Sequence, residues 1–188
     1  MIKIGITGSL ASGKTTASQI ISKNKGLLFS ADSVVKKLYL KKNFKLLISK
    51  KLGIKPALKI KENLRKKIIK NKKNLSKLEK IIHPFVRKEM FYFIKKNKKS
   101  NFLFFEIPLL IESKLMKHFN VIIFIKSKKS LRLKRYRKKG GEAKLFRILD
   151  NHQMKDHKKT KFCDYIVVNN SSLQFLKKKL LNIIQFYE

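Results

Sequence analysis

A short glycine-containing stretch near the start of the sequence has the spacing of a phosphate-binding loop. Residues 8–15 read GSLASGKT and match the pattern G-x-x-x-x-G-K-[ST] in full. Glycine lets the backbone of such a loop curl until its N–H groups point at phosphate oxygens. The lysine, here Lys14, reaches the β- and γ-phosphates of a nucleotide, and the hydroxyl of Thr15 binds Mg²⁺. We therefore predict that Lys14 is catalytic and that Thr15 is a metal ligand.

The loop indicates a nucleotide but does not identify the acceptor of a phosphoryl group. No N-K-x-D motif for reading guanine follows, and a motor or helicase is normally longer than 188 residues. A small-molecule kinase fits this pattern better. The residues predicted to hold the nucleotide phosphates are Ser9, Leu10, Ala11, Ser12, Gly13, Lys14, Thr15 and Thr16.

Short apolar runs alternate with helical patterns along the chain, which predicts an α/β fold of the P-loop NTPase type. Its parallel five-stranded sheet would be flanked by helices. The predicted strands are residues 2–7, 27–32, 102–106, 121–125 and 165–168. A helix should follow the loop from Thr15 to near Gly26, and a terminal helix should bury one face with Leu173, Leu176, Leu180, Ile184 and Tyr187.

The order of these elements predicts a core with an insertion. We assign residues 1–35 and 100–188 to a nucleotide-binding core and residues 36–99 to an inserted helical lobe that binds the acceptor substrate. Residues 128–157 of the core should form a helical lid, in which Gly140 and Gly141 join two helices as a hinge.

The formal charge of +37 has two interpretations. Lysine occurs in every segment and only six of the 48 basic residues are Arg, so a bias in genome composition explains the charge without a specific nucleic-acid partner. Binding of a polyanion remains the alternative. The sequence shows no secretory signal and no apolar run long enough to cross a membrane, so we expect a cytoplasmic protein. The single cysteine, Cys163, should be a packed small residue.

Asp32 is placed by the pattern at the carboxyl end of the second strand. In open α/β sheets, ligands bind outside these strand ends, so its carboxylate is suited to handle the hydroxyl of an acceptor. The alternative is an N-cap of the helix that begins SVVKKLY, and the two roles are compatible.

Further segments narrow the choice of kinase. Residues 78–87 read LEKIIHPFVR and residues 106–112 read EIPLLIE. The segment HQM, in the lid region, is followed by KFCDYIVVNN toward the end of the chain. Together with SLASGKTT and SADSVV, they resemble the dephospho-coenzyme A kinase family over essentially the whole chain and in the right order.

This resemblance implies transfer of the γ-phosphate of ATP to the ribose 3′-hydroxyl of dephospho-coenzyme A, the last step of coenzyme A synthesis, with Mg²⁺. Asp32 would orient or deprotonate the hydroxyl, and Glu106 would be an outer-shell partner of the metal. The other residues expected at the acceptor are His83, Arg87, Pro108, Leu109 and Glu112, and Pro84 would fix the approach to a helix. We expect a monomer or a weak oligomer.

The resemblance also places basic residues of the lid over ATP. Arg132, Arg135 and Lys139 stand where the family carries such residues, and Arg135 is predicted to be catalytic. Lys139 and Gly140 replace the usual R-D, and Lys155 replaces the usual Pro, which leaves the lid contacts open. Two alternatives remain: a P-loop kinase with another acceptor, and a basic nucleic-acid-binding protein with a vestigial loop.

Overall fold

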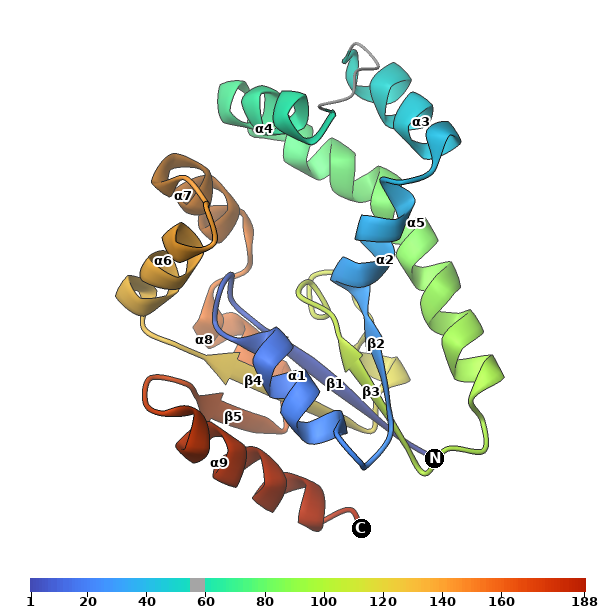
Figure 1. Ribbon diagram of the computed structural model, residues 1–188, viewed down its shortest axis with the longest axis vertical. Coiled ribbons are helices and arrows are strands. Elements are labelled where there is room, and N and C mark those ends of the chain that lie inside the picture. Colours follow the sequence, from blue (N-terminus) through green and yellow to red (C-terminus); the bar gives the residue numbers. More distant parts are fainter. Residues whose placement is uncertain (55–59) are drawn as a thin grey trace. The chain divides into compact units, whose positions relative to one another are not determined.

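The computed structural model describes residues 1–54 and 60–188, and the chain divides into two compact units. One unit comprises Met1–Ser30 and Phe93–Glu188 and contains a sheet, whereas the other comprises Ala31–Tyr92 and is helical (Figure 1). Residues 55–59, which the sequence assigned to the helical lobe, lie outside the described residues. The predicted α/β fold is confirmed.

The sheet of the first unit has five parallel strands in the order β2-β3-β1-β4-β5. Continuous apolar runs form its central strands, as expected where both faces of a parallel sheet are covered. All five predicted strands are confirmed, with changes at some ends. The strands are β1 (Ile2–Gly8), β2 (Leu27–Ser30), β3 (Phe102–Glu106), β4 (Val121–Lys126) and β5 (Tyr165–Val168).

The end of β2 corrects the predicted position of Asp32. The pairing of β2 with β3 stops at Ser30, which lies opposite Glu106, the last residue of β3. No ladder partner remains for the next residues, and Ala31 begins helix α2 (Ala31–Leu38). Asp32 therefore lies inside the first turn of a helix, neither at a strand end nor at the N-cap.

One face of the sheet is covered by α1 (Lys14–Ser22) and α9 (Leu173–Gln185), which also contact each other. Side chains from both helices and the sheet form a single apolar core. The predicted stripe of the terminal helix is confirmed at Leu176, Leu180 and Ile184 but wrong at Leu173. Leu173 is the first residue of α9 and is 61% exposed, so the buried stripe begins one turn later.

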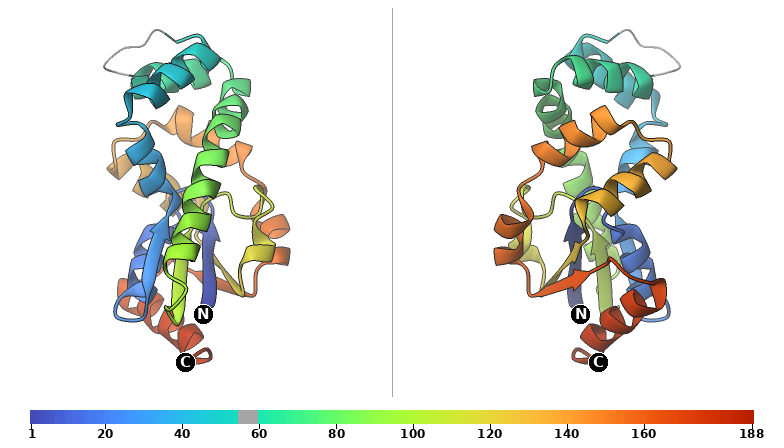
Figure 2. Two further views of the ribbon diagram at one scale, coloured as in Figure 1. Left: turned by 90° about the vertical axis from the view of Figure 1, so that its right-hand side faces the viewer. Right: turned by 90° about the vertical axis from the view of Figure 1, so that its left-hand side faces the viewer.

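The lid segment forms two helices, α6 (Lys129–Lys138) and α7 (Ala143–His152), which contact each other (Figure 2). The prediction of two helices joined at the double glycine is confirmed, whereas the mobility of this joint stays a prediction. A short helix α8 (Asp156–Lys159) follows, and single 3₁₀ turns lie at Met116–His118 and Thr160–Phe162.

Helices α2, α3 (Lys42–Leu52), α4 (Ile60–Lys70) and most of α5 (Lys73–Lys96) form the second unit. Its buried residues come from all four helices and include Leu38, Phe44, Ile48, Leu64, Ile68, Leu78, Val86 and Met90. No helix within the described residues is long and apolar enough to span a membrane.

The helical unit ends at Tyr92, within helix α5, and not at residue 99 as the sequence analysis predicted. The last turn of α5 belongs to the first unit, because the ring of Phe93 lies 5.6 Å from the rings of both Phe29 and Phe105. The helix also runs through Pro84, so the prediction that this proline marks the approach to a helix is wrong. Proline removes one backbone hydrogen bond, and the packing of the flanking turns outweighs this loss.

Candidate active site

The predicted phosphate loop connects the end of β1 to the start of α1. Gly8 has φ +148° and Gly13 has φ +100°, conformations that other residues rarely adopt. A Cβ at Gly8 would lie 2.4 Å from the Ile125 carbonyl oxygen, and one at Gly13 would lie 2.2 Å from Asn169 Nδ2. Both glycines are therefore required by the local backbone and by the close approach of β4 and of the segment after β5.

Lys14 lies inside this loop and is 8% exposed. Its Nζ donates hydrogen bonds to the carbonyl oxygens of Gly8, at 3.1 Å, and Ser9, at 2.9 Å. The ammonium group is thus held by the loop backbone, as needed for a charge that binds nucleotide phosphates.

Thr15 contacts a buried carboxylate. Its hydroxyl donates a hydrogen bond to Glu106 Oε1, and the hydroxyl of Ser30 donates to Glu106 Oε2 at 3.0 Å. Glu106 is 2% exposed. The end of β3 and the end of β2 therefore bring oxygen ligands to the first turn of α1.

These oxygens fit Mg²⁺ in a nucleotide site. Among residues 1–54 and 60–188, no group of three or more His, Cys, Asp or Glu side chains could enclose a metal ion. Mg²⁺ at a phosphoryl-transfer site is typically held by one or two protein ligands and by the phosphates of the nucleotide. The donor set of Thr15 and Glu106 matches this type of site.

Two arginines of α6 bind the loop backbone. Arg135 donates to the carbonyl oxygens of Ser12, at 3.3 Å, and Asn169, at 3.1 Å. Arg132 donates to the carbonyl oxygen of Leu10 at 3.2 Å and pairs with Asp150 on α7. Both predicted lid arginines thus lie at the loop, and their contacts with ATP stay predictions.

Lys139, the third basic residue predicted for the lid, lies at the end of α6. It follows the last residue of this helix and is exposed, so its side chain is not part of the loop contacts in this structure. Its contact with a nucleotide also stays a prediction.

Sequence reasoning did not assign four side chains to the site. Gln153 accepts a hydrogen bond from the Leu10 N–H at 3.0 Å, and Asp156 accepts one from the Ser9 hydroxyl. Asn169 donates to the Ser12 carbonyl oxygen at 2.8 Å, and the Ser127 hydroxyl receives a hydrogen bond from an arginine of the lid. Gln153 and Asn169 lie in the quoted segments HQM and KFCDYIVVNN, which supplied a signal, whereas Asp156 and Ser127 had none.

The predicted acceptor residues of the first unit follow β3. The Pro108 carbonyl oxygen accepts a hydrogen bond from the Thr7 hydroxyl at 3.1 Å, and Leu109 is half-buried next to it. Glu112 forms a 2.6 Å ion pair with Lys159, which is fully buried. One carboxylate oxygen of Glu112 is therefore already engaged within the protein.

The other predicted acceptor residues belong to the second unit. Asp32 is exposed in the first turn of α2. His83 and Arg87 are four residues apart on α5, so they share one face of this helix. Their contacts with an acceptor stay predictions.

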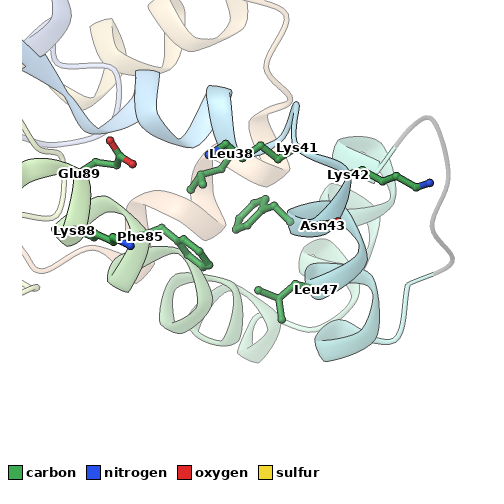
Figure 3. Close-up of a pocket in the computed structure, with 9 residues that line it drawn as sticks. Leu38, Lys41, Lys42, Asn43, Leu47, Phe85, Lys88 and Glu89 are labelled. Atoms are coloured by element: carbon green, nitrogen blue, oxygen red, sulfur yellow. The ribbon is translucent and has the colours of Figure 1, made fainter. Parts of the chain in front are cut away.

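A cavity of about 630 Å³ opens on another face of α5 (Figure 3). Phe85 and Phe44 contribute aromatic rings 5.4 Å apart, and lysines surround this apolar surface. Because an α-helix turns about 100° per residue, Phe85 and Glu89 project roughly opposite to His83 and Arg87. The cavity therefore lies apart from the face that was predicted to bind the acceptor. Its lining residues are Leu38, Lys41, Lys42, Asn43, Phe44, Leu47, Phe85, Lys88 and Glu89.

Comparison with known proteins identifies the family. A dephospho-CoA kinase from Fusobacterium nucleatum is 30% identical over 182 residues, which cover 94% of this chain and 94% of the relative. The crystal structure of TT1252 from Thermus thermophilus has a TM-score of 0.77 at 22% identity and covers 98% of this chain and 97% of its own. Dephospho-CoA kinase from Campylobacter jejuni has a TM-score of 0.62 at 22% identity, with coverages of 99% and 97%. Residues 2–174 match the dephospho-CoA kinase family, and the chain therefore belongs to this family.

Proposed function

We propose that this chain transfers the γ-phosphate of ATP to the ribose 3′-hydroxyl of dephospho-CoA and so forms coenzyme A. The observation that carries the proposal is the family match over residues 2–174. The phosphate loop adds the chemistry of the donor, but by itself it would identify a nucleotide and leave the acceptor open.

The loop residues Ser9 to Thr16 hold the phosphates of ATP in this proposal. Backbone N–H groups and the amino-terminal end of α1 attract the phosphate oxygens. Lys14 exchanges its hydrogen bonds to the Gly8 and Ser9 carbonyl oxygens for bonds to the β- and γ-phosphates. Its charge then stabilises the transferring group more strongly in the transition state than in the ground state.

Mg²⁺ is held at Thr15, with Glu106 as the neighbouring carboxylate. Support comes from the hydrogen bond that joins their side chains and from the burial of Glu106. When bound, the ion neutralises charge on the β- and γ-phosphate oxygens. Glu106 accepts a hydrogen bond from the Thr15 hydroxyl and so orients the lone pairs of the hydroxyl oxygen toward the metal ion.

Asp32 aligns the acceptor in this proposal. Its carboxylate accepts a hydrogen bond from the 3′-hydroxyl and takes the proton as the oxygen attacks phosphorus. The exposure of Asp32 leaves the carboxylate accessible to a substrate. The body of dephospho-CoA is held by the remaining predicted residues, which are His83, Arg87, Pro108, Leu109 and Glu112.

The lid arginines complete the site around the phosphates. Arg135 and Arg132 already hold the backbone of the loop through Ser12 and Leu10. Guanidinium groups that are hydrogen-bonded to the loop are suited to neutralise charge on the transferring phosphoryl group. Lys139 would add a further positive charge when the lid closes over ATP.

A panel of acceptors tests this proposal against other kinase activities. The purified chain is mixed with ATP and Mg²⁺, and ADP release is measured with dephospho-CoA, shikimate, deoxyadenosine or AMP. Release that depends on dephospho-CoA supports the proposal. Faster release with one of the other acceptors would replace it with a different small-molecule kinase.

A further inference from the structure

Side chains from outside the phosphate loop hold the main chain on both sides of Ala11. Leu10 is held at its N–H by Gln153 and at its carbonyl oxygen by Arg132, with distances of 3.0 and 3.2 Å. On the other side, the Ser12 carbonyl oxygen accepts hydrogen bonds from Arg135 and Asn169. The residues on either side of Ala11, Leu10 and Ser12, are therefore held by four side chains.

Ala11 itself has a left-handed backbone with φ +58°. An L-residue with a Cβ disfavours this conformation, so it persists only where the surroundings impose it. A turn closed by the hydrogen bond from the Ser12 N–H to the Ser9 carbonyl oxygen, at 3.1 Å, places Ala11 at its third position, and the four side-chain hydrogen bonds hold this turn in place. Without them, the loop would be expected to populate conformations in which its N–H groups no longer converge on phosphate oxygens.

Gln153 is connected to a further contact through the next residue of the chain. The next residue, Met154, donates its N–H to Glu112 Oε1 at 3.2 Å. The same oxygen pairs with Lys159 Nζ at 2.6 Å. The segment that directly follows Gln153, residues 154–159, is thus attached at both ends to the carboxylate of Glu112.

The burial of Lys159 makes this attachment specific. Its side chain is 0% exposed, and a buried ammonium group is tolerated only when it is paired. By contrast, the neighbouring Lys158 is exposed, as are most lysines of this basic chain. Moving residues 154–159 away from Glu112 would leave the buried ammonium group of Lys159 without its carboxylate partner.

We propose that Gln153 is a positioning residue for ATP, and that the ion pair of Glu112 with the buried Lys159 keeps Gln153 against the Leu10 N–H. Through this chain of contacts, Gln153 holds Ala11 in its left-handed conformation and prepares the loop for phosphate. The inference rests on the proposed binding of ATP by the loop. Gln153 itself contacts the loop backbone and takes no part in the transfer.

Equilibrium binding of ADP tests the role of Gln153. Gln153→Met keeps a side chain of similar length but cannot accept the Leu10 hydrogen bond, so we expect the Kd for ADP to rise about tenfold. Adding Ala11→Gly should return it to within about threefold of wild type, because glycine adopts positive φ without strain. A purely structural loss would not be repaired by this glycine. Unchanged affinity in Gln153→Met, or no rescue by Ala11→Gly, would overturn the proposal.

A second comparison tests the ion pair. Glu112→Gln combined with Lys159→Met removes both charges together and keeps an oxygen for the Met154 N–H. We expect the Kd for ADP to rise about fivefold and to change little further when Gln153→Met is added, because both changes act on one contact. Lys158→Met is the matched control and should bind ADP as wild type does. Independent, multiplicative effects of the pair and of Gln153→Met would contradict the proposed connection.

These measurements separate the inference from the proposed function. Binding of ADP reports on the loop without any acceptor. If the wild-type chain binds ADP but does not phosphorylate dephospho-CoA, the proposed function fails while the role of Gln153 can still be decided. If the variants bind ADP normally while the wild type forms coenzyme A, only the positioning role fails.

Discussion

The hydroxyl of Thr15 donates a hydrogen bond to the buried carboxylate of Glu106, although 91 residues separate them in the sequence. Register explains their meeting, because Glu106 lies opposite Ile6 in the parallel pairing of β3 with β1. The carboxyl ends of both strands therefore lie at one edge of the sheet, where α1 begins. This contact connects the phosphate loop to the proposed Mg²⁺ ligands.

Replacing Glu106 should reduce the apparent affinity of the enzyme for Mg²⁺ more than it reduces the stability of the fold. Glu106→Gln keeps a hydrogen-bond acceptor for Thr15 but removes the charge, so the Mg²⁺ concentration that gives half of the maximal rate should rise several-fold. Titrations of activity with Mg²⁺ measure this shift. The control is Glu62→Gln, an exposed position on α4 that forms an ion pair with Lys66. Identical Mg²⁺ dependence in Glu106→Gln and wild type would exclude Glu106 from the metal site.

Removing the loop lysine should nearly abolish transfer. Lys14→Ala eliminates the charge that accompanies the phosphates into the transition state, and we expect a loss of kcat of at least about 10²-fold. Steady-state kinetics and a thermal melt measure activity and folding together. Lys23→Ala, an exposed position just after α1, is the matched control. Turnover like that of wild type in Lys14→Ala would show that phosphoryl transfer occurs elsewhere.

Asp32→Asn separates acceptor chemistry from nucleotide binding. The amide keeps the size of the side chain but cannot take the proton, so turnover should fall by about 10²–10⁴-fold while the affinity for ATP stays close to that of wild type. Single-turnover kinetics and ATP binding measure the two effects. Because Asp32 is the only acidic residue in the first turn of α2, a modest loss of helix stability is also expected. Unfolding of the variant, or unchanged turnover, would reduce Asp32 to a structural residue.

The lid should respond to acid through Asp150. Burial raises the pKa of Asp150, but hydrogen bonds from Arg132 and Lys129 outweigh it, so the pKa lies below its ordinary value. A lowered pKa in the folded state stabilises the protein above the unfolded-state pKa, and this contribution is lost as the pH falls through the folded value. Wild type should therefore exceed Asp150→Asn in free energy of unfolding near neutral pH. Denaturant titrations should show the difference shrinking below about pH 4; a constant difference would argue against an ionised Asp150.

Local spacing was sufficient to predict the loop, the strands and the two lid helices. The pattern around Gly8, Gly13 and Lys14 is contiguous in sequence, and parallel strands leave continuous apolar runs such as residues 121–125. The family resemblance added the acceptor. These features share one property, which is that the signal lies within a few consecutive residues.

Features that depend on distant partners could not be predicted. The helical unit ends at Tyr92 because Phe93 packs on Phe29 and Phe105, a contact that no local pattern encodes. Lys159 is chemically distinct only through its burial against Glu112, and among so many lysines its identity carried no signal. The end of β2 at Ser30 was likewise set by its partner strand, which moved Asp32 into a helix.

The most direct test of the central claim is the position of the phosphate in the product. Purified chain, ATP, Mg²⁺ and dephospho-CoA are incubated, and the product is analysed by mass spectrometry and phosphorus NMR against authentic coenzyme A, with Lys14→Ala as the reference for background transfer. The proposal predicts one added phosphate on the ribose 3′-hydroxyl, formed in step with ADP and absent with Lys14→Ala. No ATP-dependent product, or a phosphate at any other position, would contradict it.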